Sequence, residues 1–187
     1  MTDVTEKGVS PVRERMLAHG DWLLGTVPPP TRPLAWTDWE TRGTTWLKPG
    51  TLFGAVVIRA ALVHAALDRD SPVACATALD IRLGGGPVFY TDDAFQREGS
   101  YTVLVPSYAA REWRVGGSLA HPHRALLEVP APGIVKPERA LPWWVVPLEG
   151  PADLCSPEEV ATMVIQGRAL LAGSGGEDEE QGGRDDA

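Results

Sequence analysis

Acidic and histidine side chains with metal-ligand chemistry occur at two places near the middle of the chain. Asp92 and Asp93 follow one apolar run, and His121 and His123 flank a proline ahead of another. Carboxylates bind Mg²⁺ and Mn²⁺, and imidazoles join them in many centres, provided that three or four ligands converge. These four residues are therefore one hypothesis for a catalytic metal site. A solvated loop is the alternative for the histidine pair.

The other titratable residues favour structural roles. The one Asp-x-Asp motif, Asp68-Arg-Asp70, comes at a predicted helix end before Ser71-Pro72, a turn setting in which acidic residues are common. His19 and His64 fall within helical patterns, which predicts packing or surface positions. The motif therefore gives only weak support to a metal site.

Two cysteines, Cys75 and Cys155, are far apart and show no CxxC spacing. We expect both to be buried and unpaired. No GxSxG, HExxH, P-loop or kinase signature occurs in the sequence, so the common hydrolase and kinase classes lose support.

Three tryptophans, Trp36, Trp39 and Trp46, lie close together in the sequence and form one candidate binding surface. Single-strand binders stack bases on aromatic rings, but they pair those rings with basic residues that follow the phosphates. Few basic residues occur near these tryptophans. Core or loop packing is therefore the favoured interpretation.

Arg111, Arg114 and Arg124 are candidates for a local basic patch, although the chain has only 17 Lys and Arg residues and no basic run. The net charge is −8, of which the segment from Glu177 to Ala187 supplies −5. That glycine-rich, acidic segment predicts a disordered tail over residues 174–187. Its sharper alternative is an arm that contacts a basic partner or masks a nucleic-acid site.

Strand patterns closed by prolines are the clearest structural signal. The chain has 187 residues, of which 43% are hydrophobic and 22% charged, which suits one globular domain. β-Branched and aromatic runs end at Pro106, Pro130 and Pro147, residues that cannot donate to a strand ladder. We expect strands over 55–58, 73–77, 79–83, 87–90, 101–105, 125–129 and 143–146, with a hairpin turn at Gly84-Gly-Gly86.

Helix signals frame these strands. Ser156-Pro-Glu-Glu159 is a capping signature, and with the other patterns it predicts helices near 11–24, 59–68 and 156–172 and a helical turn over 107–113. Residues 1–9 are expected to be disordered. Residues 10–33 are expected to hold the first helix and a rigid proline-rich linker, and residues 34–173 an α+β domain.

The longest apolar stretch, Leu52 to Leu67, contains Arg59 and His64 and is too short to span a membrane. The N-terminus shows no basic segment followed by an apolar one, so no secretory signal is predicted. We therefore expect a cytoplasmic protein with no membrane association.

Two runs, Phe53-Gly-Ala-Val-Val-Ile58 and Tyr101-Thr-Val-Leu-Val-Pro106 with Trp113, resemble the motifs D-x-V-x-V and hhhVPPGTAxxW. These motifs occur in small actinobacterial proteins that are similar to the N-terminal domain of bifunctional DNA primase/polymerases (prim-pol). Leu126-Leu-Glu-Val-Pro-Ala-Pro132 is similar to their Y-x-x-V-P-P, and Trp144-Val-Val-Pro147 with Leu154-Cys-Ser-Pro-Glu-Glu159 to W-L-V-P-P…L-T-D-P. About residues 44–172 are covered.

The resemblance implies a single α+β domain, a central mixed β-sheet flanked by helices in reduced prim-pol form. Prim-pol enzymes hold divalent metals on acidic strand residues, but residues 53–58 contain no carboxylate. The leading hypothesis is therefore a non-catalytic, degenerate prim-pol-like binding or accessory protein without a cofactor, acting through a protein partner or self-association. Nucleic acid is a weaker partner hypothesis. The alternative is a Mg²⁺- or Mn²⁺-dependent nucleotide-binding or nucleotidyl-transfer enzyme with relocated carboxylates.

Overall fold

A five-stranded sheet forms the centre of the fold in the computed structural model, which describes residues 11–92, 98–138 and 141–174. Its strand order is β5-β2-β4-β3-β7. The strands are β2 (Gly54–Arg59), β3 (Val88–Thr91), β4 (Ser100–Val105), β5 (Ser118–Ala120) and β7 (Trp143–Val146). All of its pairings are antiparallel. The α+β class is confirmed, with an antiparallel sheet in place of the expected mixed one.

Both faces of this sheet are covered, which explains why its strands are apolar at successive positions. Side chains alternate between faces along a strand. Val56, Val103 and Val145 accordingly belong to one hydrophobic cluster, whereas Leu104 and Trp144 belong to the other. The fold therefore has two apolar layers, one on each side of the central sheet.

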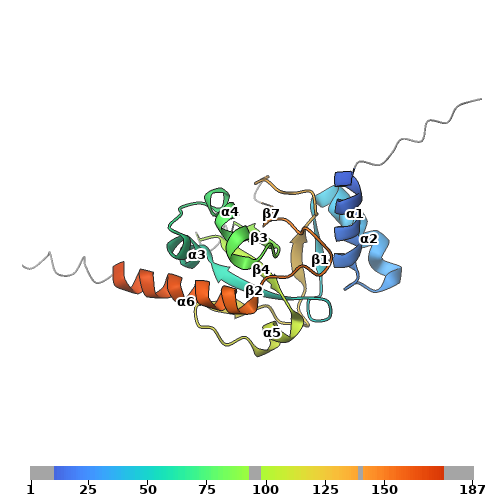
Figure 1. Ribbon diagram of the computed structural model, residues 1–187. Coiled ribbons are helices and arrows are strands. Elements are labelled where there is room, and N and C mark those ends of the chain that lie inside the picture. The colour runs from blue at the N-terminus through green and yellow to red at the C-terminus, as the bar shows by residue number, and fades with distance from the viewer. Residues whose placement is uncertain (1–10, 93–97, 139–140, 175–187) are drawn as a thin grey trace, which may run out of the picture.

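Helices cover the first face (Figure 1). They are α3 (Ala60–Leu67), α4 (Pro72–Leu83), α6 (Pro157–Ser174) and the short α5 (Ser107–Glu112). A serine precedes both α4 and α6 and accepts a hydrogen bond from a backbone N–H of the first turn, and a proline occupies the first helical position. The same N-capping pattern therefore begins two helices that pack on one face of the sheet.

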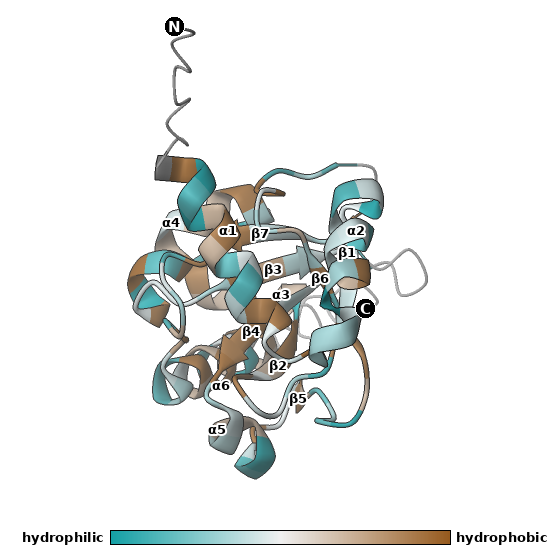
Figure 2. Cartoon of the chain, turned by 90° about the vertical axis from the view of Figure 1, so that its right-hand side faces the viewer, coloured by the Kyte–Doolittle hydropathy of each residue, from teal (hydrophilic) through white to brown (hydrophobic). Residues whose placement is uncertain are grey.

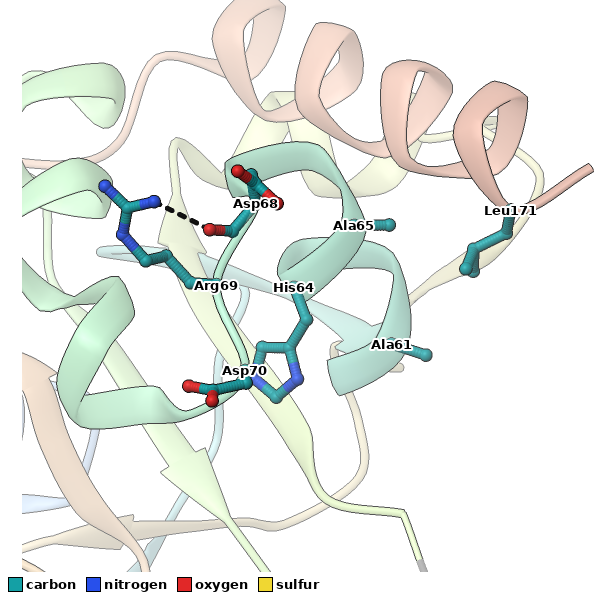
Figure 3. Close-up of a pocket in the computed structure, with 7 residues that line it drawn as sticks. All are labelled: Ala61, His64, Ala65, Asp68, Arg69, Asp70 and Leu171. Carbon is teal, nitrogen blue, oxygen red and sulfur yellow. Dashed lines mark hydrogen bonds between the residues drawn. The ribbon is translucent and has the colours of Figure 1, made fainter. Parts of the chain in front are cut away.

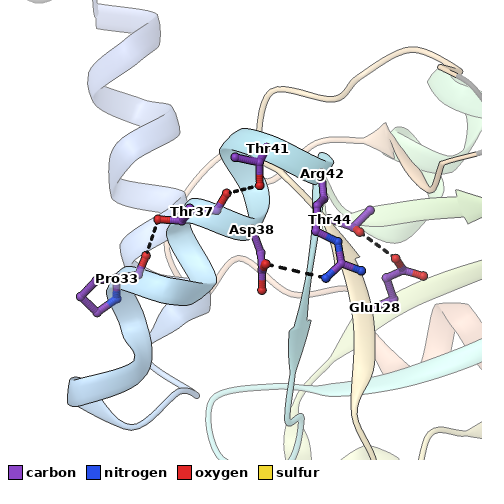
Figure 4. Close-up of polar contacts among 7 residues, drawn as sticks. All are labelled: Pro33, Thr37, Asp38, Thr41, Arg42, Thr44 and Glu128. Carbon is purple, nitrogen blue, oxygen red and sulfur yellow. Dashed lines mark hydrogen bonds and ion pairs between the residues drawn. The ribbon is translucent and has the colours of Figure 1, made fainter.

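The second face is covered by α1 (Pro11–Leu24), α2 (Arg32–Arg42) and a two-stranded antiparallel sheet of β1 (Thr44–Leu47) and β6 (Leu127–Pro130). Figure 2 shows α1 in front of the central strands. The side chain of Thr44 donates a 2.7 Å hydrogen bond to Glu128 across the small sheet, and Arg42 pairs with Asp38 on α2 (Figure 4). The indole N–H of Trp39 on α2 donates a 3.1 Å hydrogen bond to the Val129 carbonyl on β6, so α2 and the small sheet form one layer.

The expected strands at 73–77 and 79–83 and the hairpin turn between 79–83 and 87–90 are wrong, because residues 72–83 form α4. Cys75, Leu79 and Leu83 are buried at a spacing of four residues, and Ile81 between them is 78% exposed. Gly84 has φ +73° and ends the helix as a left-handed cap. Gly84 and Gly85 do adopt positive φ, but they follow the end of a helix instead of turning a hairpin.

The expected proline-rich linker over 27–33 is also wrong. Pro29–Thr31 is a short 3₁₀ helix (η1), and α2 begins directly after it at Arg32. Pro33 lies in the first turn of α2, where its missing N–H has no intrahelical acceptor. Leu23 and Leu24 of α1 share a core cluster with strand residues. The first helix therefore packs on the sheet, and no boundary separates residues 10–33 from 34–173.

The remaining element predictions agree with the structure. The helices at 11–24, 59–68 and 156–172, the strands at 55–58, 101–105, 125–129 and 143–146, and the turn at 107–113, now α5 (Ser107–Glu112), are confirmed within a few residues. The expected disordered N-terminus and nearly all of the acidic tail lie outside the described residues. Within the described part of the chain, no helix is both long enough and apolar enough to cross a membrane.

Candidate functional site

The strand register places the candidate metal ligands at opposite ends of the central sheet. Asp92 directly follows β3. The register aligns Thr91, the last residue of β3, with Ser100 of β4 and with Arg59, the last residue of β2. The backbone N–H of His121 instead bonds Ala55, near the other end of β2, at 2.8 Å. Four residues of strand separate Ala55 from Arg59, which is about 13 Å. The structure therefore does not bring Asp92 to the histidines, and Asp93 lies outside the described residues.

The Asp68-Arg-Asp70 motif lines an open pocket of about 660 Å³ with His64 (Figure 3). Asp68 has φ +52° and ends α3 as its left-handed cap, and Arg69 donates a 2.6 Å hydrogen bond to the Asp68 carbonyl. Among the residues that the structure describes, no group of three or more His, Cys, Asp or Glu side chains is placed to hold a metal ion. The motif here shapes the turn between α3 and α4.

His64 joins α3 to the central sheet. Its Nε2 lies 2.9 Å from the hydroxyl of Tyr101 on β4. Burial lowers the pKa of His64, an effect that the Asp70 carboxylate partly opposes, and burial raises the pKa of Tyr101 well above its ordinary value. Both groups are therefore neutral at pH 7. The hydrogen bond fits the packing role that the sequence predicts for His64.

The two cysteines are buried and free, as expected. Burial raises the pKa of both thiols. Because the thiolate is the nucleophilic form, neither cysteine has the chemistry of a catalytic nucleophile.

The three candidate tryptophans take different positions. Trp39 is 5% exposed, and its indole N–H donates a 3.1 Å hydrogen bond to the Val129 carbonyl, so its main role is packing. Trp46 on β1 is 45% exposed. Trp36 lies half-buried on α2, with its ring against Gly20 of α1 and its centroid 5.8 Å from that of Trp39. Only Trp36 and Trp39 therefore share a site.

That site is a pocket of about 420 Å³ between α1, α2 and the segment at 131–133, here called the α1–α2 pocket. Trp36, Trp39, Met16 and Leu17 supply apolar walls, and the charged side chains of Arg13 and Glu40 complete the lining together with Ala131, Pro132 and Gly133. Met16 is 37% and Leu17 40% exposed. The volume lies in the range of ligand and anchor pockets, about 300–1,000 Å³.

The sequence predicts a binding surface at the tryptophans but does not single out Met16 and Leu17 as part of it. The available signal was in the first helix, where Val12 and Met16 are four residues apart and recur on one side. In the structure both remain exposed, as does every described side chain from Val12 to Ala18. An apolar helix side that faces solvent indicates an interaction surface.

Two of the three candidate arginines lie together. Arg111 and Arg114 line a small pocket with His121 and His123, whereas Arg124 is exposed and does not line it. The structure thus combines residues from two separate hypotheses, the metal set and the basic patch. The arrangement brings guanidinium and imidazole nitrogens to one place.

The chain matches no protein-family model, no curated protein and no solved structure in comparisons with known proteins. The resemblance to prim-pol proteins therefore stays a prediction from the short motifs alone.

Proposed function

We propose that this chain is a non-catalytic binding or accessory protein, a degenerate relative of prim-pol domains, that uses the α1–α2 pocket to bind a protein. The observation that carries the proposal is the position of Met16, Leu17, Trp36 and Trp39, four large apolar residues around one open pocket. Aromatic and methionine side chains are enriched at protein interfaces, where they fill or line anchor pockets.

The lining favours an apolar side chain of a protein as the occupant. Trp36 and Met16 offer apolar contact area, while Arg13 and Glu40 add one charge of each sign. A polar rim around an apolar centre is the usual anatomy of a protein interface. The partner is either another protein or a second copy of this chain, and the expected compartment is the cytoplasm. Nucleic acid is a weaker candidate because no Lys or Arg run accompanies the tryptophans.

Site-specific photo-crosslinking tests this proposal. A photoreactive phenylalanine analogue replaces Leu17 in the full chain, and a matched variant carries it at Ile81, an apolar residue that is 78% exposed on α4. We expect a discrete adduct from position 17 in cells of the source organism and none from position 81. The adduct mass separates a second copy from a different protein.

The variant Met16→Glu supplies the second arm of the test. Met16 is partly exposed, so a carboxylate there is compatible with folding, yet it adds charge at the edge of the apolar pocket. The adduct from position 17 is expected to fall at least about tenfold, as for loss of an interface anchor. Equal adducts from positions 17 and 81, or an adduct that persists with Met16→Glu, would refute the proposal.

A further inference from the structure

A pocket lined by arginine and histidine side chains lies beside Gly54, the first residue of β2. It has a volume of about 170 Å³ and is formed by the segment at 49–54, by α5 and by the residues that follow β5. We propose that this pocket binds the phosphate group of a small ligand. Its polar side chains are Ser107, Arg111, Arg114, His121 and His123, and none of the described residues that line it is acidic.

The two guanidinium groups are held in place by backbone carbonyls. Arg111 donates a 2.6 Å hydrogen bond to Gly50, and Arg114 donates a 2.7 Å hydrogen bond to the carbonyl of Trp113. Each bond engages one terminal nitrogen of a group that carries five N–H donors. Anchored guanidinium groups lose less side-chain entropy when a ligand binds, since part of their freedom is already lost.

Glycines allow the walls to approach closely. Gly50 has φ +121°, and a Cβ atom at that position would lie 2.8 Å from Cβ of His123. A Cβ atom at Gly54 would fall against the Ala110 side chain of α5. The pocket is thus bounded by backbone on two sides, which fixes the spacing between Arg111 and the histidine segment.

One ring nitrogen in this wall has no hydrogen-bond partner. Nε2 of His121 is shielded from solvent and unpaired among the described residues, although the backbone N–H of His121 bonds Ala55. A buried polar atom without a partner costs about 1–3 kcal/mol. A ligand oxygen reached by a small rotation of the ring would remove that cost.

Phosphate fits this donor set better than other anions do. Guanidinium forks match the oxygens of phosphate or carboxylate in pairs, but two arginines, two imidazoles and a hydroxyl offer more donors than the two oxygens of a carboxylate accept. The volume is below the range of about 300–1,000 Å³ that whole drug-sized ligands occupy. The pocket therefore suits a phosphate group, whether free or at the end of a larger molecule.

Titration of the full chain with inorganic phosphate at constant ionic strength tests the proposal, since added salt alone screens charge. Two-dimensional amide NMR follows the N–H groups of residues 50, 111 and 121. We expect saturable shifts there, an affinity at least about tenfold lower in Arg114→Gln, and little change in Arg124→Gln. Arg124 is the matched control because it is an exposed arginine one residue beyond His123 that does not line the pocket.

Further arms fix the source of the phosphate and guard against misfolding. A nucleoside monophosphate that binds more tightly than inorganic phosphate assigns the site to phosphate esters, and equal affinities assign it to the free ion. If Arg114→Gln loses the native amide spectrum, the exposed His123→Gln replaces it as the decisive variant. Absence of saturation, equal shifts with sodium chloride, or equal losses in Arg114→Gln and Arg124→Gln would overturn the proposal.

Discussion

Replacing Gly167 with alanine is expected to lower the free energy of unfolding by about 2 kcal/mol, within the usual range for overpacking. Gly167 lies on α6 where that helix crosses α3, and a Cβ atom there would fall against the carbonyl oxygen of Leu62. Because a backbone carbonyl within a helix cannot rotate away, α6 must shift as a unit. This cost exceeds the gain of about 1 kcal/mol that alanine brings to a helix interior. Urea unfolding followed by circular dichroism measures the change.

The matched control is Gly173→Ala in the same helix. No heavy atom lies within 4 Å of a Cβ at Gly173, so only helix propensity changes. Near the helix end we expect a gain of about 0.5 kcal/mol. If Gly167→Ala and Gly173→Ala both stabilise the protein, the close crossing of α3 and α6 is wrong.

Replacing Trp144 with alanine is expected to cost about 3–5 kcal/mol, the usual range for a buried tryptophan. Trp144 is 1% exposed, packs edge-on against Phe89, and donates hydrogen bonds to the carbonyls of Pro130 and Ala131 at 3.3 and 3.1 Å. It therefore ties the central sheet to the last residue of β6 and to the residue that follows it. Thermal and urea unfolding measure the loss.

Two further variants separate the contributions of Trp144. Trp144→Phe keeps most of the apolar contact and removes the N–H, so it should cost about 1–3 kcal/mol for the lost hydrogen bonds. The Ala131 carbonyl still accepts a hydrogen bond from the backbone N–H of Ile134. Trp46→Ala removes a tryptophan that is 45% exposed and should have a much smaller effect. A loss from Trp46→Ala as large as that from Trp144→Ala would contradict the assignment of these two residues to surface and core.

The sequence pattern predicts strands well where their side chains alternate between two apolar faces and their ends carry prolines, as in β4 and β7. The pattern wrongly predicts a strand within α4, because Leu79, Ile81 and Leu83 alternate with polar residues as the residues of a half-buried strand do. In a helix the same residues place Leu79 and Leu83 inward and Ile81 outward, and the outward isoleucine hides the helical period. Ser71-Pro72 has the same N-cap and first-turn proline as Ser156-Pro157, and this helix-start signal predicts α4 better than the alternation of apolar residues does.

The candidate sites depend on register, which composition does not encode. The chemistry of their side chains groups His121 with Asp92 as metal ligands. In the structure, however, His121 follows β5 and Asp92 follows β3, and the two residues lie at opposite ends of the sheet. In the same way, Arg111 and His123 come from separate motifs, and only the antiparallel pairing of β5 with β2 brings them to one pocket. Sequence spacing alone therefore groups the wrong residues.

The claim that decides the function is that this chain acts by binding and not by metal-dependent nucleotide chemistry. Isothermal titration of a nucleoside triphosphate into the full chain, with and without Mn²⁺, tests it directly. We predict that Mn²⁺ does not tighten nucleotide binding in the wild type, in Asp92→Asn or in His121→Gln, because Asp92 and His121 lie at opposite ends of the central sheet. Mn²⁺-dependent tightening in the wild type that both variants abolish would contradict the account and establish a metal–nucleotide site.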